Sequence, residues 1–188
     1  MKVTDIIGRK PELETLKYLY ESQKSEFLAI YGRRRVGKSF LIEEAFEGEM
    51  AFNAVGIFKK DTDSSAYKKS QLVHFHECLI EYGLKREETH VPESWREAFA
   101  LLRKLLARKR ARKKVVFLDE LPWMDTPRSN FISAFEHFWN SWASARKDIV
   151  LIICGSATSW IINKVINDHG GLHNRVTRQI ALQPFTLR

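Results

Sequence analysis

Apolar positions along the chain follow two patterns. Runs that are apolar at nearly every position predict buried strands, at 27–31, 50–55, 115–118 and 149–154, and a last extended piece is predicted at 176–182. Segments with apolar residues three or four positions apart predict helices, from Pro11 to before Ser22, at 38–46, at about 65–82, from 94 to about 109, from Thr126-Pro127 onward, and around Trp160. Strands that alternate with helices predict an α/β fold with three layers, in which helices cover both faces of a five-stranded parallel sheet.

An aromatic face is predicted on the helix that starts at Thr126-Pro127. The residues that share it are Phe131, Phe135, Phe138 and Trp142. Such a face is buried in a core, against a further domain, or against another copy of the chain. The sequence therefore leaves open a homo-oligomer or a protein partner.

Residues 32–39 form a complete phosphate-loop pattern, G-x-x-x-x-G-K-[ST], between a predicted strand and a predicted helix. Gly32 and Gly37 allow the backbone N–H groups to converge on an anion, and the helix that follows directs its positive end to the same place. Lys38 is expected to contact the β- and γ-phosphates, and Ser39 to bind Mg²⁺. The residues predicted to bind the nucleotide are Gly32, Arg33, Arg34, Arg35, Val36, Gly37, Lys38 and Ser39.

Two carboxylates follow the apolar run 115–118. A buried parallel strand that ends in acids presents them at the edge of the sheet where ligands bind. Asp119 is expected to accept from Mg²⁺-bound water and to offset phosphate charge. Glu120 is expected to polarise the attacking water as the general base. The alternative is a strand that ends in two solvated acids.

Polar residues also follow the strand 149–154. Ser156 is the candidate to sense the γ-phosphate, and Thr158 is the second choice. The alternative is a Gly-Ser turn that caps the helix containing Trp160, and one residue can do both.

Composition fits one globular domain without a membrane span. The chain has 188 residues, of which 44% are hydrophobic and 29% charged. Its strongly apolar stretch 149–154 is too short to cross a bilayer, and no signal peptide opens the chain. Two isolated cysteines, Cys78 and Cys154, do not form a disulfide framework and fit a reducing compartment. We therefore expect a cytoplasmic protein.

Five ordered blocks carry a family resemblance: Ile7–Leu13, Tyr31–Ser39, Leu118–Trp123, Cys154–Ser156, and Leu172–Arg175 running into Leu182–Phe185. Together they resemble the prokaryotic, archaeal-type ATPases of the STAND group, relatives of the AAA+ proteins. The resemblance implies a P-loop NTPase domain over 1–188 that binds ATP and Mg²⁺. It also implies an additional strand between the phosphate-loop strand and the acidic strand.

Two arginines take roles from this resemblance. Arg175 matches an arginine near the nucleotide, which would stabilise charge on the transferred phosphoryl group in cis or from a neighbouring subunit. Arg9, in the opening Gly8-Arg9 motif, is likewise expected near the nucleotide. Family members usually continue past the Pro-Phe motif into a helical or winged-helix region, and we expect this chain to lack it.

Other nucleotide chemistries fit less well. A guanine-specific protein would carry an N-K-x-D element, and Asn163-Lys164-Val165-Ile166 lacks the aspartate. A small-molecule kinase is an alternative, because Arg33-Arg34-Arg35 resembles part of an arginine-rich lid. The acid pair 119–120 favours hydrolysis over transfer.

A nucleic-acid-binding module in which ATP binding is regulatory is the alternative from another class. The run Arg103–Lys114 carries eight basic residues in twelve, and the net charge of +8 favours anionic partners. The other interpretation is a solvated helix end. Because no sequence-specific DNA- or RNA-binding motif is present, contact with DNA is expected to be nonspecific.

A zinc site is not expected. His74, His76 and Cys78 lie close together in sequence, but zinc needs about four ligands and no second pair has suitable spacing.

Overall fold

A parallel five-stranded sheet forms the centre of the protein. The computed structural model describes residues 6, 8–58, 64–167 and 170–185, so Ile7 of the first family block lies outside them. The strands are β1 (Glu26–Tyr31), β2 (Met50–Val55), β3 (Lys114–Asp119), β4 (Ile149–Gly155) and β5 (Arg178–Ala181), in the order β2-β3-β4-β1-β5. All four neighbouring pairs are parallel. Strand β4 lies between β1 and β3, so the expected additional strand is confirmed.

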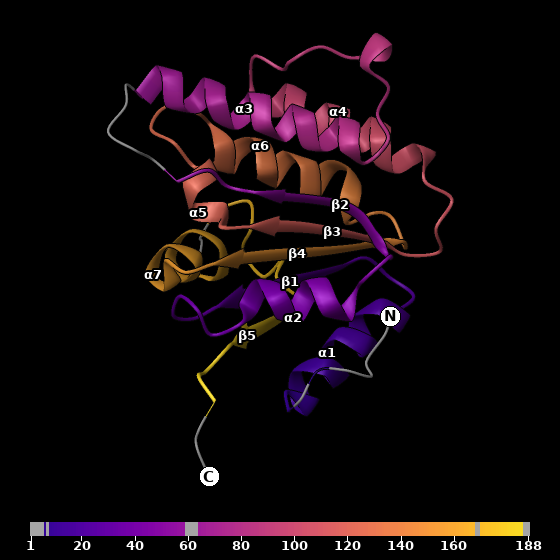
Figure 1. Ribbon diagram of the computed structural model, residues 1–188, viewed down its shortest axis with the longest axis vertical. Coiled ribbons are helices and arrows are strands. Elements are labelled where there is room, and N and C mark those ends of the chain that lie inside the picture. The colour runs from indigo at the N-terminus through magenta and orange to yellow at the C-terminus, as the bar shows by residue number, and fades with distance from the viewer. Residues whose placement is uncertain (1–5, 7, 59–63, 168–169, 186–188) are drawn as a thin grey trace.

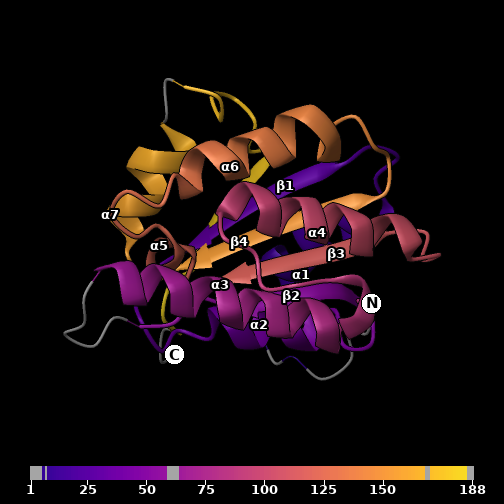
Figure 2. The same cartoon turned by 90° about the horizontal axis from the view of Figure 1, so that it is seen from above.

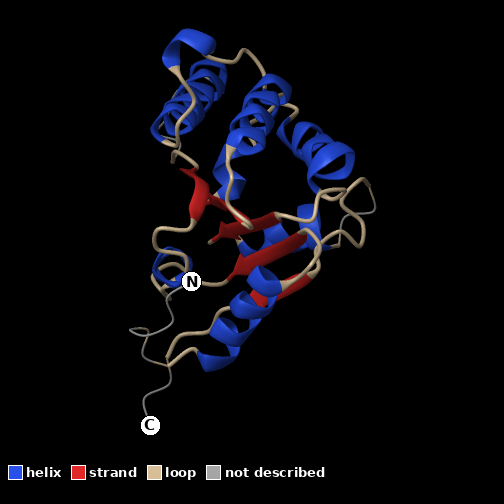
Figure 3. Cartoon of the chain, turned by 90° about the vertical axis from the view of Figure 1, so that its right-hand side faces the viewer, coloured by secondary structure: helices blue, strands red, loops and turns tan. Residues whose placement is uncertain are grey.

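Helices cover both faces of this sheet (Figures 1 and 3). One face carries α3 (Ser64–Glu81), α4 (Trp95–Arg108) and α6 (Phe131–Phe138), and the other carries α1 (Lys10–Glu21) and α2 (Lys38–Ala45). Alternate residues of β1 pack into the hydrophobic cores on the two faces of the sheet. Phe27 and Ala29 pack on the face covered by α3, α4 and α6, and Leu28 and Ile30 on the face covered by α1 and α2. The nearly unbroken apolar character of the central strands follows from this double burial.

Short elements complete the chain: α5 (Leu121–Met124), α7 (Thr158–Ile161), a 3-10 turn at Arg86–Glu88, and single π-helical turns at Trp139–Ala143 and Ile162–Ile166. Helix α4 begins where its capping signal predicts, since the Ser94 hydroxyl accepts from the N–H of Glu97 at 3.3 Å. None of the helices in the described ranges is long and apolar enough to cross a membrane.

The helix expected from Thr126-Pro127 begins later, at Phe131. Arg128 and Asn130 have positive φ angles of 59° and 55°, which no continuous α-helix allows. The predicted aromatic face is nevertheless present. Phe131, Phe135 and Phe138 are buried, and all three rings contact Phe99 of α4. Helix α6 lies beside α4 (Figure 2).

The two ends of the parallel strands carry different kinds of residues. The arrowheads of β2, β3 and β4 point to the side where α5 and α7 lie, which is also the side of the predicted nucleotide-binding residues (Figure 1). The connection from α4 to β3, which carries the end of the basic run, lies at the opposite edge. The predicted nucleotide-binding residues and the end of the basic run therefore lie at opposite ends of the strands.

Candidate functional site

The phosphate loop follows β1 directly and depends on its glycines. Gly32 has a φ angle of 148° and Gly37 of 88°. A Cβ atom on Gly32 would lie 2.4 Å from the carbonyl oxygen of Leu182. The N–H of Leu182 donates to the Tyr31 carbonyl at 2.8 Å, so the chain leaving β5 packs against the first residue of the loop. Only glycine fits this approach.

Lys38 occupies the inside of the loop. Its side chain is 6% exposed, and Nζ donates to the carbonyl oxygens of Gly32 at 3.0 Å and Arg33 at 2.8 Å. Lys38 is also the first residue of α2, so its ammonium group lies beside the positive end of that helix. A cation and backbone N–H groups in one loop have the chemistry that suits an anion.

Ser39 and Asp119 meet at the end of β3. The Ser39 hydroxyl donates to Oδ2 of Asp119 at 2.5 Å, and Oδ1 of Asp119 accepts from the N–H of Glu120 at 2.7 Å. Asp119 is buried with no lysine or arginine paired to it among the described residues. A hydroxyl and a carboxylate are oxygen ligands of the type that Mg²⁺ prefers, so these two residues fit that metal. In the described part of the chain, no group of three or more histidine, cysteine or acidic residues is arranged so that it could hold a metal ion by itself.

Glu120 turns away from the strand toward Ser156. Its φ angle is 45°, and this left-handed residue separates β3 from α5. Oε2 of Glu120 accepts from the N–H of Ser156 at 3.2 Å and from its hydroxyl at 3.0 Å. Thr158, the second choice, is the first residue of α7. The structure thus brings Ser156 to the acid pair.

Cys154 adds a buried thiol beside this cluster. Burial, together with the nearby Asp119 carboxylate, raises the pKa of Cys154 well above its usual value. The thiol is therefore neutral at physiological pH and serves as a small apolar side chain.

Arg9 lies beside the phosphate loop. Its guanidinium donates to the carbonyl oxygens of Val36 at 3.2 Å and Gln183 at 2.7 Å, and it lies 4.1 Å from the centroid of the Phe185 ring. Arg9 therefore joins the loop to the segment that follows β5.

Arg34 makes contacts that sequence spacing did not indicate. Its Nε donates to the Ser156 hydroxyl at 3.4 Å. Its guanidinium lies 5.4 Å from the centroid of the Trp123 ring and 5.9 Å from that of Phe58. The three partners come from different segments of the chain, so no local sequence signal links them.

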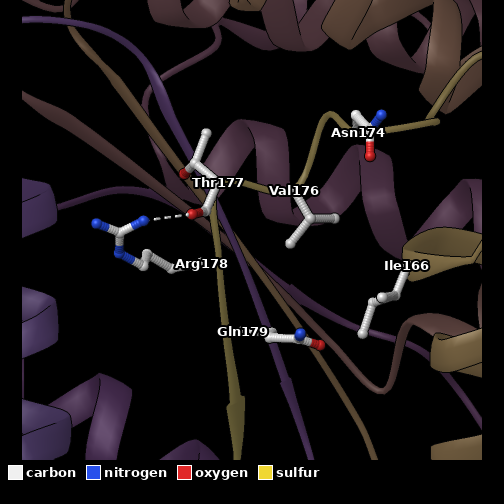
Figure 4. Close-up of a pocket in the computed structure, with 6 residues that line it drawn as sticks. All are labelled: Ile166, Asn174, Val176, Thr177, Arg178 and Gln179. Carbon is white, nitrogen blue, oxygen red and sulfur yellow. Dashed lines mark hydrogen bonds between the residues drawn. The ribbon is translucent and has the colours of Figure 1, made fainter.

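Arg175 does not join this cluster. The N–H of Thr177 donates to the carbonyl of Phe27 at 2.8 Å, which places Arg175 near the start of β1. About five residues of strand, roughly 16 Å, separate that level from Gly32. A cavity of about 370 Å³ close by in sequence is lined by Ile166, Asn174, Val176, Thr177, Arg178 and Gln179 (Figure 4). Arg175 itself is exposed.

Much of the basic run is engaged within the protein. Lys113 is buried, and Nζ donates to the carbonyls of Lys24 at 2.7 Å and Lys147 at 2.8 Å. Burial lowers the pKa of Lys113. Lys114 is paired with Asp148 at 2.6 Å.

Two further basic residues of the run share one acidic partner. Glu88 lies 2.5 Å from Arg108 and 3.9 Å from Lys104. Among the described residues of the run, Arg110 and Arg112 are exposed and form no such ion pair. Lys109, which lies between helix and strand, is partly exposed.

The histidines and Cys78 do not form a metal site. Sγ of Cys78 lies 3.8 Å from Nε2 of His74, whereas Nε2 of His76 lies 3.2 Å from the Thr89 hydroxyl. Burial raises the pKa of Cys78 to about 11, so the thiolate that zinc would need is disfavoured.

Solved structures share this fold. The Walker-type ATPase PABY2304 of Pyrococcus abyssi matches with a TM-score of 0.64 and 21% identity, over 98% of this chain and 55% of that one. Cdc6p from Pyrobaculum aerophilum matches with a TM-score of 0.58 and 18% identity, over 97% and 47%. The protein thus shares the α/β fold of these two structures.

Sequence comparison identifies the family. The uncharacterized protein MJECL04 of Methanocaldococcus jannaschii is 27% identical over 184 residues, which are 97% of this chain and 36% of that protein. The chain thus spans about a third of that relative and about half of the first solved structure. The family model described as "ATPase domain predominantly from Archaea" matches residues 6–188. The chain belongs to this archaeal-type ATPase family.

Proposed function

We propose that this domain binds Mg²⁺-ATP and hydrolyses it, or uses its binding as an ATP-driven switch. The observation that carries the proposal is the convergence of Lys38, Ser39, Asp119, Glu120 and Ser156 at one edge of the sheet. These residues come from three separate segments of the chain. Their side chains supply, in one place, an anion site, a pair of oxygen ligands and a general base.

Each side chain has a distinct role in the proposed reaction. Lys38 and the N–H groups of 32–39 bind and orient the phosphates. Glu120 accepts a proton from the water that attacks the γ-phosphate, and Ser156 donates to a γ-phosphate oxygen. Ser39 and Asp119 would hold Mg²⁺, which when bound neutralises charge on the phosphates.

Arg175 is proposed to act on a neighbouring copy of the chain. Its position near the amino end of β5 puts it about a strand length from its own phosphate loop. Its exposure leaves it available to a second subunit. In an assembly it would place positive charge on the transferred phosphoryl group.

The Glu120→Gln variant tests the catalytic part of the proposal. An amide keeps the size of the side chain and its hydrogen bond to Ser156 but cannot accept the proton. We expect ATP binding to persist while turnover falls by about two orders of magnitude or more. Turnover equal to that of the wild type would exclude Glu120 as the base.

DNA contact is a second candidate, favoured by the exposed Arg110 and Arg112 and the partly exposed Lys109. They would neutralise phosphates nonspecifically, so binding should weaken with salt. Arg108 is paired with Glu88 and is left unchanged in the test.

Reversing these three residues to glutamate should abolish retention on duplex DNA. The matched control replaces Lys68 and Lys69 of α3 and Arg96 of α4 with glutamate. It should leave retention on duplex DNA largely unchanged. Equal loss in both triple variants would contradict a defined DNA surface. Stimulation of ATP turnover by DNA at low salt would join the two activities.

A further inference from the structure

A chain of polar contacts connects the phosphate loop with the proposed base. Nε of Arg34 donates to the Ser156 hydroxyl at 3.4 Å, and that hydroxyl donates to Glu120 at 3.0 Å. Every donor in this chain has its proton directed toward the carboxylate. A cation, a hydroxyl and an anion in this order stabilise one another, so the position of Glu120 depends on Arg34 through Ser156.

Trp123 and Phe58 provide the surface on which Arg34 lies. Their rings pack edge to face with centroids 5.2 Å apart, and the Arg34 guanidinium lies within 6 Å of both. Such cation–π contacts are attractive but weak where the arginine is exposed, as Arg34 is. Among the described residues Arg34 forms no ion pair with a carboxylate. It is therefore able to exchange these partners for a stronger anion.

The main chain of Trp123 is anchored by hydrogen bonds. Its carbonyl oxygen accepts from the Tyr67 hydroxyl at 3.0 Å and from Nε2 of Gln71 at 3.2 Å, both on α3. A Cβ atom on Gly56 would lie 3.1 Å from the Cβ of Trp123, so the residue that follows β2 packs closely behind it. The contact therefore joins an exposed arginine to an indole whose main chain is anchored.

We propose that Arg34 is a positioning residue that senses the γ-phosphate and controls Glu120 through Ser156. This inference rests on the proposed function. Without a γ-phosphate, Arg34 lies on Trp123 and Ser156 binds Glu120. A γ-phosphate in the loop accepts hydrogen bonds from Arg34 and Ser156 more strongly than a hydroxyl or a ring face does. Glu120 is then released to orient water.

ADP and ATP should consequently differ in their effect on Trp123. ADP carries no γ-phosphate, so Arg34 keeps its contacts with the indole and with Ser156. ATP draws the guanidinium away and changes the surroundings of the ring. Arg34 thereby becomes a source of discrimination between the two nucleotides, separate from Lys38, which binds the shared phosphates as well.

The experiment measures tryptophan emission and nucleotide affinity in one titration. Glu120→Gln is used as the background, so that ATP is not consumed. ATP should change the emission and ADP should not, and the change should vanish in Trp123→Phe. In Arg34→Ala, the ratio of ADP to ATP dissociation constants should fall about tenfold, the size of one charge-assisted contact to phosphate. Arg34→Lys should recover affinity for ATP in part, but not the emission change.

Arg96→Ala is the matched control, because it removes an exposed arginine of α4 outside the site. It should leave emission and affinity ratio unaltered. An unchanged ratio in Arg34→Ala, or equal emission changes with ATP and ADP, would overturn the role of Arg34 alone. Absence of binding by both nucleotides in every variant would instead overturn the proposed ATP site, and this inference with it.

Discussion

The Ser39 hydroxyl lies 2.5 Å from a carboxylate oxygen of Asp119, although 80 residues separate them in the chain. Ser39 is placed by the first turn of α2, and Asp119 by the carboxyl end of β3. Strands β1 and β3 are not neighbours, since β4 lies between them. The width of one intervening strand therefore sets the geometry of the pair.

This pair predicts how affinity responds to metal removal. In the wild type, chelation of Mg²⁺ should weaken ATP binding, because phosphate charge is no longer offset. Asp119→Asn should lose most of that metal dependence, while its affinity in chelator stays close to that of the wild type. Calorimetric titration with and without Mg²⁺ measures both. A full metal response in the variant would show that the cation binds elsewhere.

Lys38→Met should remove most nucleotide affinity. Methionine fills the volume of the buried stem but cannot bind phosphate or donate to the carbonyls of Gly32 and Arg33. We expect the dissociation constant for ATP to rise about 100-fold or more. Thermal unfolding without nucleotide is the control for an intact fold. Wild-type affinity in a folded variant would refute the role of the loop.

The two loop glycines should differ in their tolerance of alanine. At Gly32 the new methyl group would approach the Leu182 carbonyl to 2.4 Å, and backbone must move. At Gly37 nothing lies within 4 Å, and only the positive φ angle of 88° opposes the change. We expect Gly37→Ala to cost about 1–2 kcal/mol and Gly32→Ala clearly more. Denaturant unfolding should rank them so, and the reverse order would contradict the packing described.

Asp148 should stabilise the fold in a pH-dependent way. Burial opposes its charge, but hydrogen bonds from Arg146 and Lys114 hold the pKa of Asp148 at about 2, below its ordinary 3.8. A carboxyl group whose pKa is lower in the folded state stabilises the fold at pH values above its unfolded-state pKa. This stabilisation is lost as the pH falls toward 2. The shift corresponds to about 2 kcal/mol.

Asp148→Asn should therefore be less stable than the wild type by about that amount at pH 5 to 7. The difference should shrink between pH 4 and pH 2. Unfolding curves measured across this range test it. A difference that is independent of pH would assign the effect to packing instead of charge.

Periodicity and motif spacing predicted the strands, the parallel sheet and the acid pair, because these depend on local pattern. The predicted start of α6 was wrong, because Arg128 and Asn130 adopt left-handed conformations that neither residue type requires. Ser156 was predicted to be a candidate site residue from its position after a buried strand. Its contact with Glu120 joins ends of two neighbouring strands, which the family topology made foreseeable.

Other contacts depend on partners distant in sequence and were not predictable. The run Arg103–Lys114 contains no acid, yet Glu88 and Asp148 pair with three of its members from outside it. Arg34 meets Trp123 only because the loops after β1 and β3 converge. The remote position of Arg175 follows from the crossover into β5, and single-residue motifs carry no information about such a path.

The close approach of Gly32 to Leu182 sets a boundary for dissecting the domain. A fragment that ends before Leu182 would lack the carbonyl beside the loop and the N–H that donates to Tyr31. The nucleotide site would then lose one wall although every motif residue was retained. The minimal unit for reconstituting the site from separate peptides therefore extends past β5 to include Leu182, well beyond Ser156.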